Sequence, residues 1–151
     1  MFEFRRIGIT LALAAGILLS NAVFADHDDQ SAAIEAAVLD YVIAFYEMRP
    51  ELIDQRVSPR LQKMGYMPAQ DSAGLTEGWM TFGQLRALAA TLNQNGLFDP
   101  ESSPRVVTVL DHSDMIATVK LEAAWGIDYL HLSRHSGDWM IINVIWETPF
   151  E

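Results

Sequence analysis

Two polar residues interrupt apolar runs near the C-terminal end of the chain. Asp128 lies in Gly-Ile-Asp-Tyr-Leu-His-Leu at 126–132, and Asn143 lies in Trp-Met-Ile-Ile-Asn-Val-Ile-Trp at 139–146. An apolar interior favours the protonated form of a carboxyl group, which suits Asp128 to general acid or base catalysis. A buried amide such as Asn143 can orient a carbonyl or amide group of a ligand. Both residues could also serve the fold alone, with Asp128 accepting hydrogen bonds from the backbone or from Asn143.

Three aromatic residues could form the walls of a site above these polar groups. Tyr41 and Tyr46 belong to a helical pattern, and Trp79 directly precedes a second helical pattern. Such rings stack on planar heterocycles and commonly line ligand pockets. Aromatic residues at helical spacing also commonly pack in a core, so both roles stay open for these three.

The remaining polar residues do not form a motif for metal or cofactor chemistry. The chain has no cysteine, which excludes disulfides, thiolate catalysis and zinc–thiolate sites. His112, His131 and His135 fall on different predicted turns and strands, so they do not combine into a ligand set. No glycine-rich phosphate loop and no Gly-x-Ser-x-Gly motif occurs. We therefore expect no metal and no cofactor.

Residues 115–147 contain three β-rich runs separated by two candidate tight turns, Trp125-Gly126 and Ser136-Gly137. This pattern predicts a three-stranded antiparallel meander, in which directly opposed residues share a face. With two-residue loops, the more apolar face is expected to point into the core. It carries Ala117, Val119, Leu121, Ala123, Asp128, Leu130, Leu132, Ile141, Asn143 and Ile145. The other face would carry Tyr129, His131, Val144 and Trp146, and a slip of one residue would exchange the faces.

The earlier part of the chain predicts helices followed by strands. Ser31 is a candidate cap for a long helix over 32–48, whose apolar residues recur at helical spacing. Thr81-Phe-Gly-Gln84 has the form of a capping box at the start of another helix. The other expected elements are a short helix at 51–57, a short strand at 61–67, a loop at 68–78 and a strand at 105–110. Helices segregated from an antiparallel sheet indicate an α+β fold.

The N-terminal segment has the composition of an export signal. Arg5 and Arg6 precede an apolar run at 7–19, and small residues then lead to Val-Phe-Ala at 23–25. This predicts a signal peptide at 1–25, cut after Ala25 or after Ala22. The alternative interpretation is an uncleaved membrane anchor. Residues 26–31 would be a disordered lead-in. The net charge of −10 argues against binding to nucleic acid or anionic membrane.

Several segments resemble the nuclear-transport-factor-2-like (NTF2-like) superfamily, and within it the putative lumazine-binding, SnoaL-like group. The similar segments are 34–46, 57–65, Ile-Asp-Tyr-Leu-His-Leu at 127–132 and Gly-Asp-Trp-Met-Ile-Ile-Asn-Val-Ile-Trp at 137–146. The resemblance implies a cone-shaped domain over 32–151, in which a curved antiparallel sheet wraps around the N-terminal helices. It also implies a small-ligand site and pairing of two copies through the outer face of the sheet.

Three functions are consistent with these patterns. The first is an exported domain that binds a small planar or apolar molecule, with Asp128 and Asn143 as the polar floor and Tyr41, Tyr46 and Trp79 as walls. The second is an isomerase-like enzyme, similar to SnoaL or ketosteroid isomerase, that transfers protons through Asp128. The third is a non-catalytic interaction module or homodimer that uses the outer face around Trp146.

Overall fold

The computed structural model describes the chain at residues 12–69, 74–135 and 137–148, with side chains described from residue 28 onward. By its internal contacts the chain divides into two compact units, residues 1–30 and residues 31–151. The predicted signal peptide falls partly on residues 1–11, which lie outside the described residues. Within the described part of the chain, no helix combines the length and the apolar character needed to cross a membrane.

The described part of the chain contains three helices, α1 (Ala12–Tyr46), α2 (Pro50–Arg56) and α3 (Phe82–Ala89). Residues 26–31, predicted to be disordered, lie within α1 instead, so Ser31 is an interior helical residue and not a cap. The physical reason is that neither glycine nor proline interrupts the chain between Gly16 and Pro50. The Ser31 hydroxyl instead lies 2.9 Å from Nε2 of His112. At the start of α3, the predicted capping box between Thr81 and Gln84 is confirmed.

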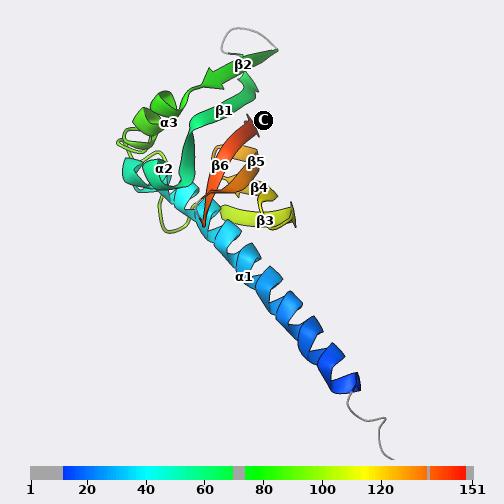
Figure 1. Ribbon diagram of the computed structural model, residues 1–151. Helices are drawn as coiled ribbons and strands as arrows, with labels where there is room; N and C mark the ends of the chain where they lie inside the picture. Colours follow the sequence, from blue (N-terminus) through cyan, green and yellow to red (C-terminus); the bar gives the residue numbers. More distant parts are fainter. Residues whose placement is uncertain (1–11, 70–73, 136, 149–151) are drawn as a thin grey trace, which may run out of the picture. The chain divides into compact units, whose positions relative to one another are not determined.

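Six strands form one curved sheet in the order β2-β1-β6-β5-β4-β3 (Figure 1). The strands are β1 (Val57–Pro68), β2 (Leu75–Met80), β3 (Arg105–His112), β4 (Ile116–Ala123), β5 (Gly126–His135) and β6 (Asp138–Glu147). Four neighbouring pairs are antiparallel, whereas β1 and β6 run parallel. The α+β prediction is therefore confirmed, but the sheet is mixed and not wholly antiparallel.

Two of these strands differ from the prediction. Strand β1 begins at Val57 and continues through Ser58 and Pro59, because its pairing with β6 is irregular between Val57 and Gln62 and does not require an amide hydrogen from the proline. Strand β2 occupies part of the predicted loop at 68–78 and pairs with β1 as a hairpin. This hairpin adds an outermost strand beside β1, next to the site described below.

The core lies between α1 and the inner face of the sheet. Tyr41, Val38 and Val42 of α1 are fully buried, as the helical stripe predicts. The first turn of the meander is shifted by one residue, so that Ala123 pairs with Gly126. Each residue of β4 therefore pairs with the β5 residue two positions away from its predicted partner. A change of two positions keeps every side chain on the same face, so the predicted inner face of β4 and β5 is confirmed.

A β-bulge changes the faces of β6. Leu132 pairs with Ile141 as predicted, but His131 pairs with Asn143, so Ile142 is an extra residue on β6. Beyond the bulge the alternation is reversed. The prediction that Asn143 points inward is therefore wrong, and so is the prediction that Trp146 lies on the outer face. Val144 is buried inside the domain, and Trp146 packs against the core.

Gly65 on β1 makes room for the ring of Trp146. The two residues are partners in the parallel pairing of β1 and β6. A Cβ atom added at Gly65 would overlap Cγ, Cδ2 and Cε2 of the indole, which are rigid ring atoms and cannot rotate away singly. The absence of a side chain at residue 65 therefore sets the position of Trp146.

We expect Gly65→Ala to lower the free energy of unfolding by about 1–3 kcal/mol, because the indole must move within a packed region. Gly83→Ala is the matched control, since nothing lies within 4 Å of an added Cβ at this helical position. The control should leave stability unchanged or raise it slightly. Urea unfolding followed by circular dichroism measures both, and equal stability of the two variants would contradict the packing described.

Candidate functional site

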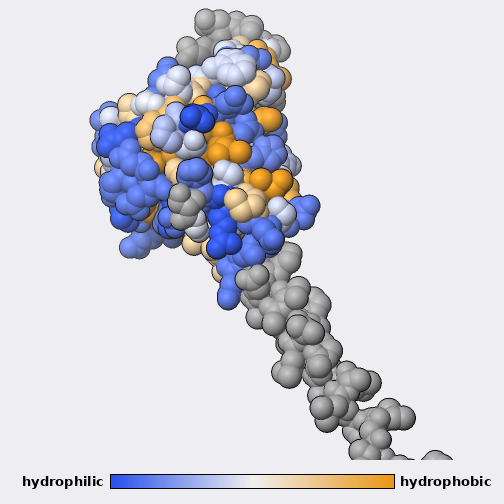
Figure 2. Space-filling view, in the orientation of Figure 1, coloured by the Kyte–Doolittle hydropathy of each residue, from blue (hydrophilic) through white to orange (hydrophobic). Residues whose placement is uncertain are grey.

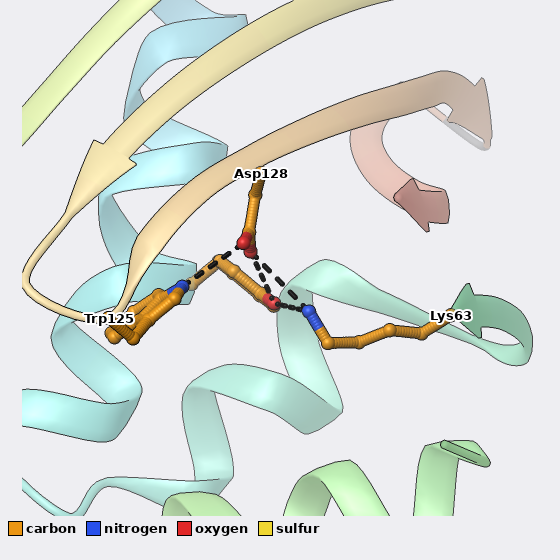
Figure 3. Close-up of polar contacts among 4 residues, drawn as sticks. Lys63, Trp125 and Asp128 are labelled. Carbon is orange, nitrogen blue, oxygen red and sulfur yellow. Dashed lines mark hydrogen bonds and ion pairs between the residues drawn. The ribbon is translucent and has the colours of Figure 1, made fainter. Parts of the chain in front are cut away.

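Asp128 is the centre of a buried polar network. It lies on the inner face of β5 with no solvent exposure. Its Oδ1 accepts a hydrogen bond from Nε1 of Trp125 at 3.0 Å, and its Oδ2 accepts one from the Tyr41 hydroxyl at 3.1 Å. Nζ of Lys63 forms an ion pair with the same Oδ2 at 3.4 Å. Figure 3 shows Lys63 and Trp125 reaching the carboxylate from opposite sides.

Two residues of this network were not predicted as site residues: Trp125, predicted only as part of a turn, and Lys63. Lys63 lies on β1, is only 6% exposed, and donates a hydrogen bond to the Tyr41 hydroxyl at 3.0 Å. Strand alternation places it on the same inner face as Leu61 and Gly65. This alternation could have identified Lys63, because a buried aspartate needs a cationic or donor partner. Of the two basic residues of β1, Arg60 and Lys63, Lys63 alternates with Leu61 and Gly65 on the inner face.

Burial dominates the electrostatics of the network. Desolvation lowers the pKa of Lys63, and the charge of Asp128 together with its hydrogen bond opposes that change. Desolvation also raises the pKa of Tyr41 well above its usual range, and the neighbouring Asp128 charge and hydrogen bond raise it further. Tyr41 is therefore a neutral hydrogen-bond donor to Asp128 at physiological pH.

A pocket of about 240 Å³ lies directly beside this network. Its lining is mostly apolar and comes from α1, β1, β2, α3 and the turn after it, the β4–β5 turn and β6. The lining residues are Tyr41, Phe45, Lys63, Met67, Met80, Leu85, Leu88, Leu92, Trp125 and Trp146. Asp128 is not one of them. Its carboxylate lies behind Tyr41, Lys63 and Trp125, which are the members of the network that line the pocket.

The structure separates the predicted wall residues. Tyr41 lines the pocket, but Tyr46 does not. The Tyr46 hydroxyl donates to the carbonyl of Pro104 at 2.7 Å and accepts from the amide of Ala124 at 2.8 Å, so it holds the β4–β5 turn. Trp79 lies on β2 with 66% of its surface exposed, outside this pocket. The prediction for Trp79 was wrong because residues 75–80 form a strand. Successive side chains of a strand point to opposite faces, so Trp79 points away from the pocket that its neighbour Met80 lines.

Asn143 is not part of the polar floor either. Because of the bulge it lies on the outer face, where its Oδ1 is 3.0 Å from Nδ1 of His131. Its Nδ2 donates to the carbonyl of Gln62 at 3.0 Å, which joins β6 to β1. Among the side chains that the structure describes, no group of three or more histidine and acidic residues is placed to hold a metal ion.

Comparison with known protein families assigns the chain. The family model described as "Putative lumazine-binding" matches residues 29–147, which include every strand and the whole network. The chain belongs to this family. No curated protein matches the chain.

Solved structures share the fold. An NTF2-like protein of unknown function from Silicibacter pomeroyi DSS-3 superposes with a TM-score of 0.63 at 18% identity, covering 80% of this chain and 96% of that one. One from Methylobacillus flagellatus KT gives 0.61 at 19% identity, with 81% and 94% covered. One from Shewanella baltica OS155 gives 0.58 at 16% identity, with 82% and 96% covered. These similarities confirm the NTF2-like fold.

We expect Asp128→Asn to destabilise the domain by about 3–5 kcal/mol, because it leaves the buried Lys63 without its counter-charge. Asp54→Asn is the matched control, since Asp54 pairs with Arg86 where both side chains are more than 40% exposed. Its cost should be much smaller, because solvent screens an exposed ion pair. Urea unfolding at pH 7 measures both variants. A cost for Asp128→Asn as small as that of the control would argue against a structural role for the ion pair.

Tyr41 should make the domain sensitive to alkaline pH. Below pH 10 its phenol is protonated in both the folded and the unfolded chain. Above pH 10 the unfolded chain loses this proton while the folded chain keeps it, because burial raises the folded-state pKa. The free energy of unfolding should therefore fall by about 1.4 kcal/mol per pH unit relative to Tyr41→Phe. Urea titrations between pH 9 and pH 11.5 test this, and parallel curves for the two proteins would refute it.

Proposed function

We propose that this chain is exported through its N-terminal segment and that its domain binds one small, planar or apolar molecule in the pocket beside Lys63. The observation that carries the proposal is the juxtaposition of an apolar pocket with a few convergent polar groups. That combination is typical of small-molecule sites. Both the family description and the fold are compatible with such a site.

The pocket lining suits a compact, flat ligand. Its volume of about 240 Å³ corresponds to a small molecule of one or two rings. The rings of Tyr41, Phe45, Trp125 and Trp146 offer aromatic contacts. Met67 adds a flexible thioether side chain that can adapt to the outline of a ligand.

The position of Asp128 favours binding over catalysis by this residue. Both carboxylate oxygens already accept hydrogen bonds, from Trp125 and Tyr41, and Lys63 pairs with one of them. A proton acceptor must come within hydrogen-bond reach of its substrate, whereas Asp128 lies behind the pocket lining. Its role in the proposed function is to orient Lys63 and Tyr41 toward the ligand.

Native mass spectrometry of the full-length protein, expressed in and purified from its own host, tests both parts of the proposal. The mass of the polypeptide should correspond to a chain beginning at Asp26 or at Val23, and a non-covalent small molecule should be retained. Leu88→Trp should abolish retention, because Leu88 lines the pocket and the larger side chain fills it. Leu97→Trp is the matched control, since Leu97 is 64% exposed and lies outside the pocket.

Retention of the same molecule by Leu88→Trp would contradict binding in this pocket. A mature protein that still carried residues 1–22 would contradict cleavage of the signal peptide. Circular dichroism of both variants ensures that loss of the molecule is not loss of the fold.

Pairing through the outer face of the sheet is a second candidate function. Tyr129 and Ile145 are direct cross-strand partners with 46% and 43% of their surfaces exposed, and Ile142, the bulge residue of the same strand β6, is 37% exposed. Figure 2 shows apolar surface in orange where β6 lies in Figure 1, bordered by hydrophilic residues. An exposed apolar patch with a polar border is typical of a protein–protein contact.

We expect Ile145→Lys to convert a dimer to a monomer, because a charge would be buried at the centre of the contact. Leu97→Lys, which changes a residue outside the sheet that is 64% exposed, against 43% for Ile145, should leave the dimer intact. Light scattering coupled to size-exclusion chromatography measures both. A monomeric wild-type protein would dismiss this candidate, without bearing on the pocket.

A further inference from the structure

Every oxygen of the polar network beside the pocket already accepts a hydrogen bond from inside the protein. The oxygens of Asp128 accept from Trp125, Tyr41 and Lys63. The Tyr41 hydroxyl donates to Asp128 and accepts from Lys63. A lysine ammonium has three N–H donors, and Lys63 has two hydrogen-bond partners among the described residues. One donor of Lys63 is therefore left for a ligand.

Trp146 carries a second donor on a ring that lines the pocket near Lys63. Its ring lines the pocket, and Nζ of Lys63 lies 5.6 Å from the ring centre. Nε1 of Trp146 is buried and has no hydrogen-bond partner among the described residues. A buried N–H without an acceptor is unfavourable, and such groups are rare in folded proteins. An acceptor atom on a bound molecule would satisfy it.

The charges of the network limit what that acceptor can be. Lys63 is 6% exposed and Asp128 is fully buried, and the pair carries no net charge. A ligand carboxylate would add an anion beside Asp128 without an unpaired cation to balance it, and burial of an unbalanced charge is costly. A hydrocarbon would leave both donors unsatisfied. A neutral oxygen acceptor meets both conditions.

We propose that the ligand, whose binding rests on the function proposed above, is a neutral and mostly apolar molecule with a carbonyl oxygen that accepts hydrogen bonds from Lys63 and Trp146. A carbonyl oxygen accepts hydrogen bonds and does not donate them. It therefore suits a pocket wall whose free polar groups are donors. The pocket thereby selects a small ketone, aldehyde, ester or amide over an acid or a hydrocarbon of the same size.

Three probes of similar size separate these ligand classes. Acetophenone carries a neutral carbonyl, benzoate carries a carboxylate and ethylbenzene carries no acceptor. Each is titrated into the ¹⁵N-labelled protein at pH 7, and the indole N–H signals of the four tryptophans are followed by NMR. Acetophenone should bind at least about tenfold more tightly than either competitor, since one added hydrogen bond to a charged or buried donor has that magnitude. It should also move the Trp146 indole signal downfield.

Two matched substitutions on β6 test whether the N–H group of Trp146 causes the preference for acetophenone. Trp146→Phe keeps an aromatic ring in the pocket but removes the N–H. It should weaken acetophenone binding several-fold and leave ethylbenzene binding unchanged. Trp139→Phe makes the same chemical change in the core, at a residue that does not line the pocket. It should keep the preference for acetophenone, and its missing signal identifies the Trp139 resonance.

The outcomes distinguish this proposal from the function on which it rests. Equal binding of acetophenone and ethylbenzene, abolished by Leu88→Trp, would overturn the carbonyl proposal and leave a ligand pocket in place. Tighter binding of benzoate would overturn the argument from charge. Acetophenone preference that survives Trp146→Phe would remove Trp146 from the site and overturn the proposal. Failure of all three probes to bind would overturn it and would also count against the pocket itself.

Discussion

A carboxylate with no contact to solvent must find its hydrogen-bond partners inside the protein, and this constraint on Asp128 organises the domain. Its partners come from three separate parts of the chain: Tyr41 from α1, Lys63 from β1 and Trp125 from the β4–β5 turn. Each partner fixes the position of the element that carries it. Leaving any of these groups unpaired would be costly, so the network favours one arrangement of helix and sheet.

The bulge in β6 is the second constraint, because it decides which side chains face the network. One extra residue at Ile142 turns Trp146 into the pocket and Asn143 onto the outer face. Gly65, which has no side chain, leaves space for the indole ring of Trp146. The same feature joins β6 to β1 on the outer face, through the hydrogen bond from Asn143 to the carbonyl of Gln62. A local irregularity of the backbone thereby contributes to both faces of the sheet.

Much of the fold could be predicted from the sequence, because its signals are local. The apolar stripe of α1, the Thr81–Gln84 capping box and the alternation along β4 and β5 each follow from neighbouring residues. The α+β class and the family resemblance follow from their order, and both are confirmed.

The site was less predictable, because its geometry depends on long-range contacts. Asp128 and Tyr41 were found by residue type, and they do meet. The bulge leaves no clear mark in the run at 139–146, so Asn143 and Trp146 were placed on the wrong faces. Lys63 was missed because the parallel pairing of β1 with β6, which brings it to the network, joins segments about 80 residues apart in sequence.

The dependence of the pocket on a buried ion pair is tested most directly by the ionisation of Lys63 itself. Its ¹³Cε signal, assigned with Lys63→Arg, can be followed through a pH titration of the folded domain by NMR. We expect a pKa below the ordinary lysine value of 10.5, because desolvation outweighs the attraction of Asp128. Titration of Lys63 together with the exposed lysines would show that its ammonium lies in water, and would contradict the buried network from which the pocket is built.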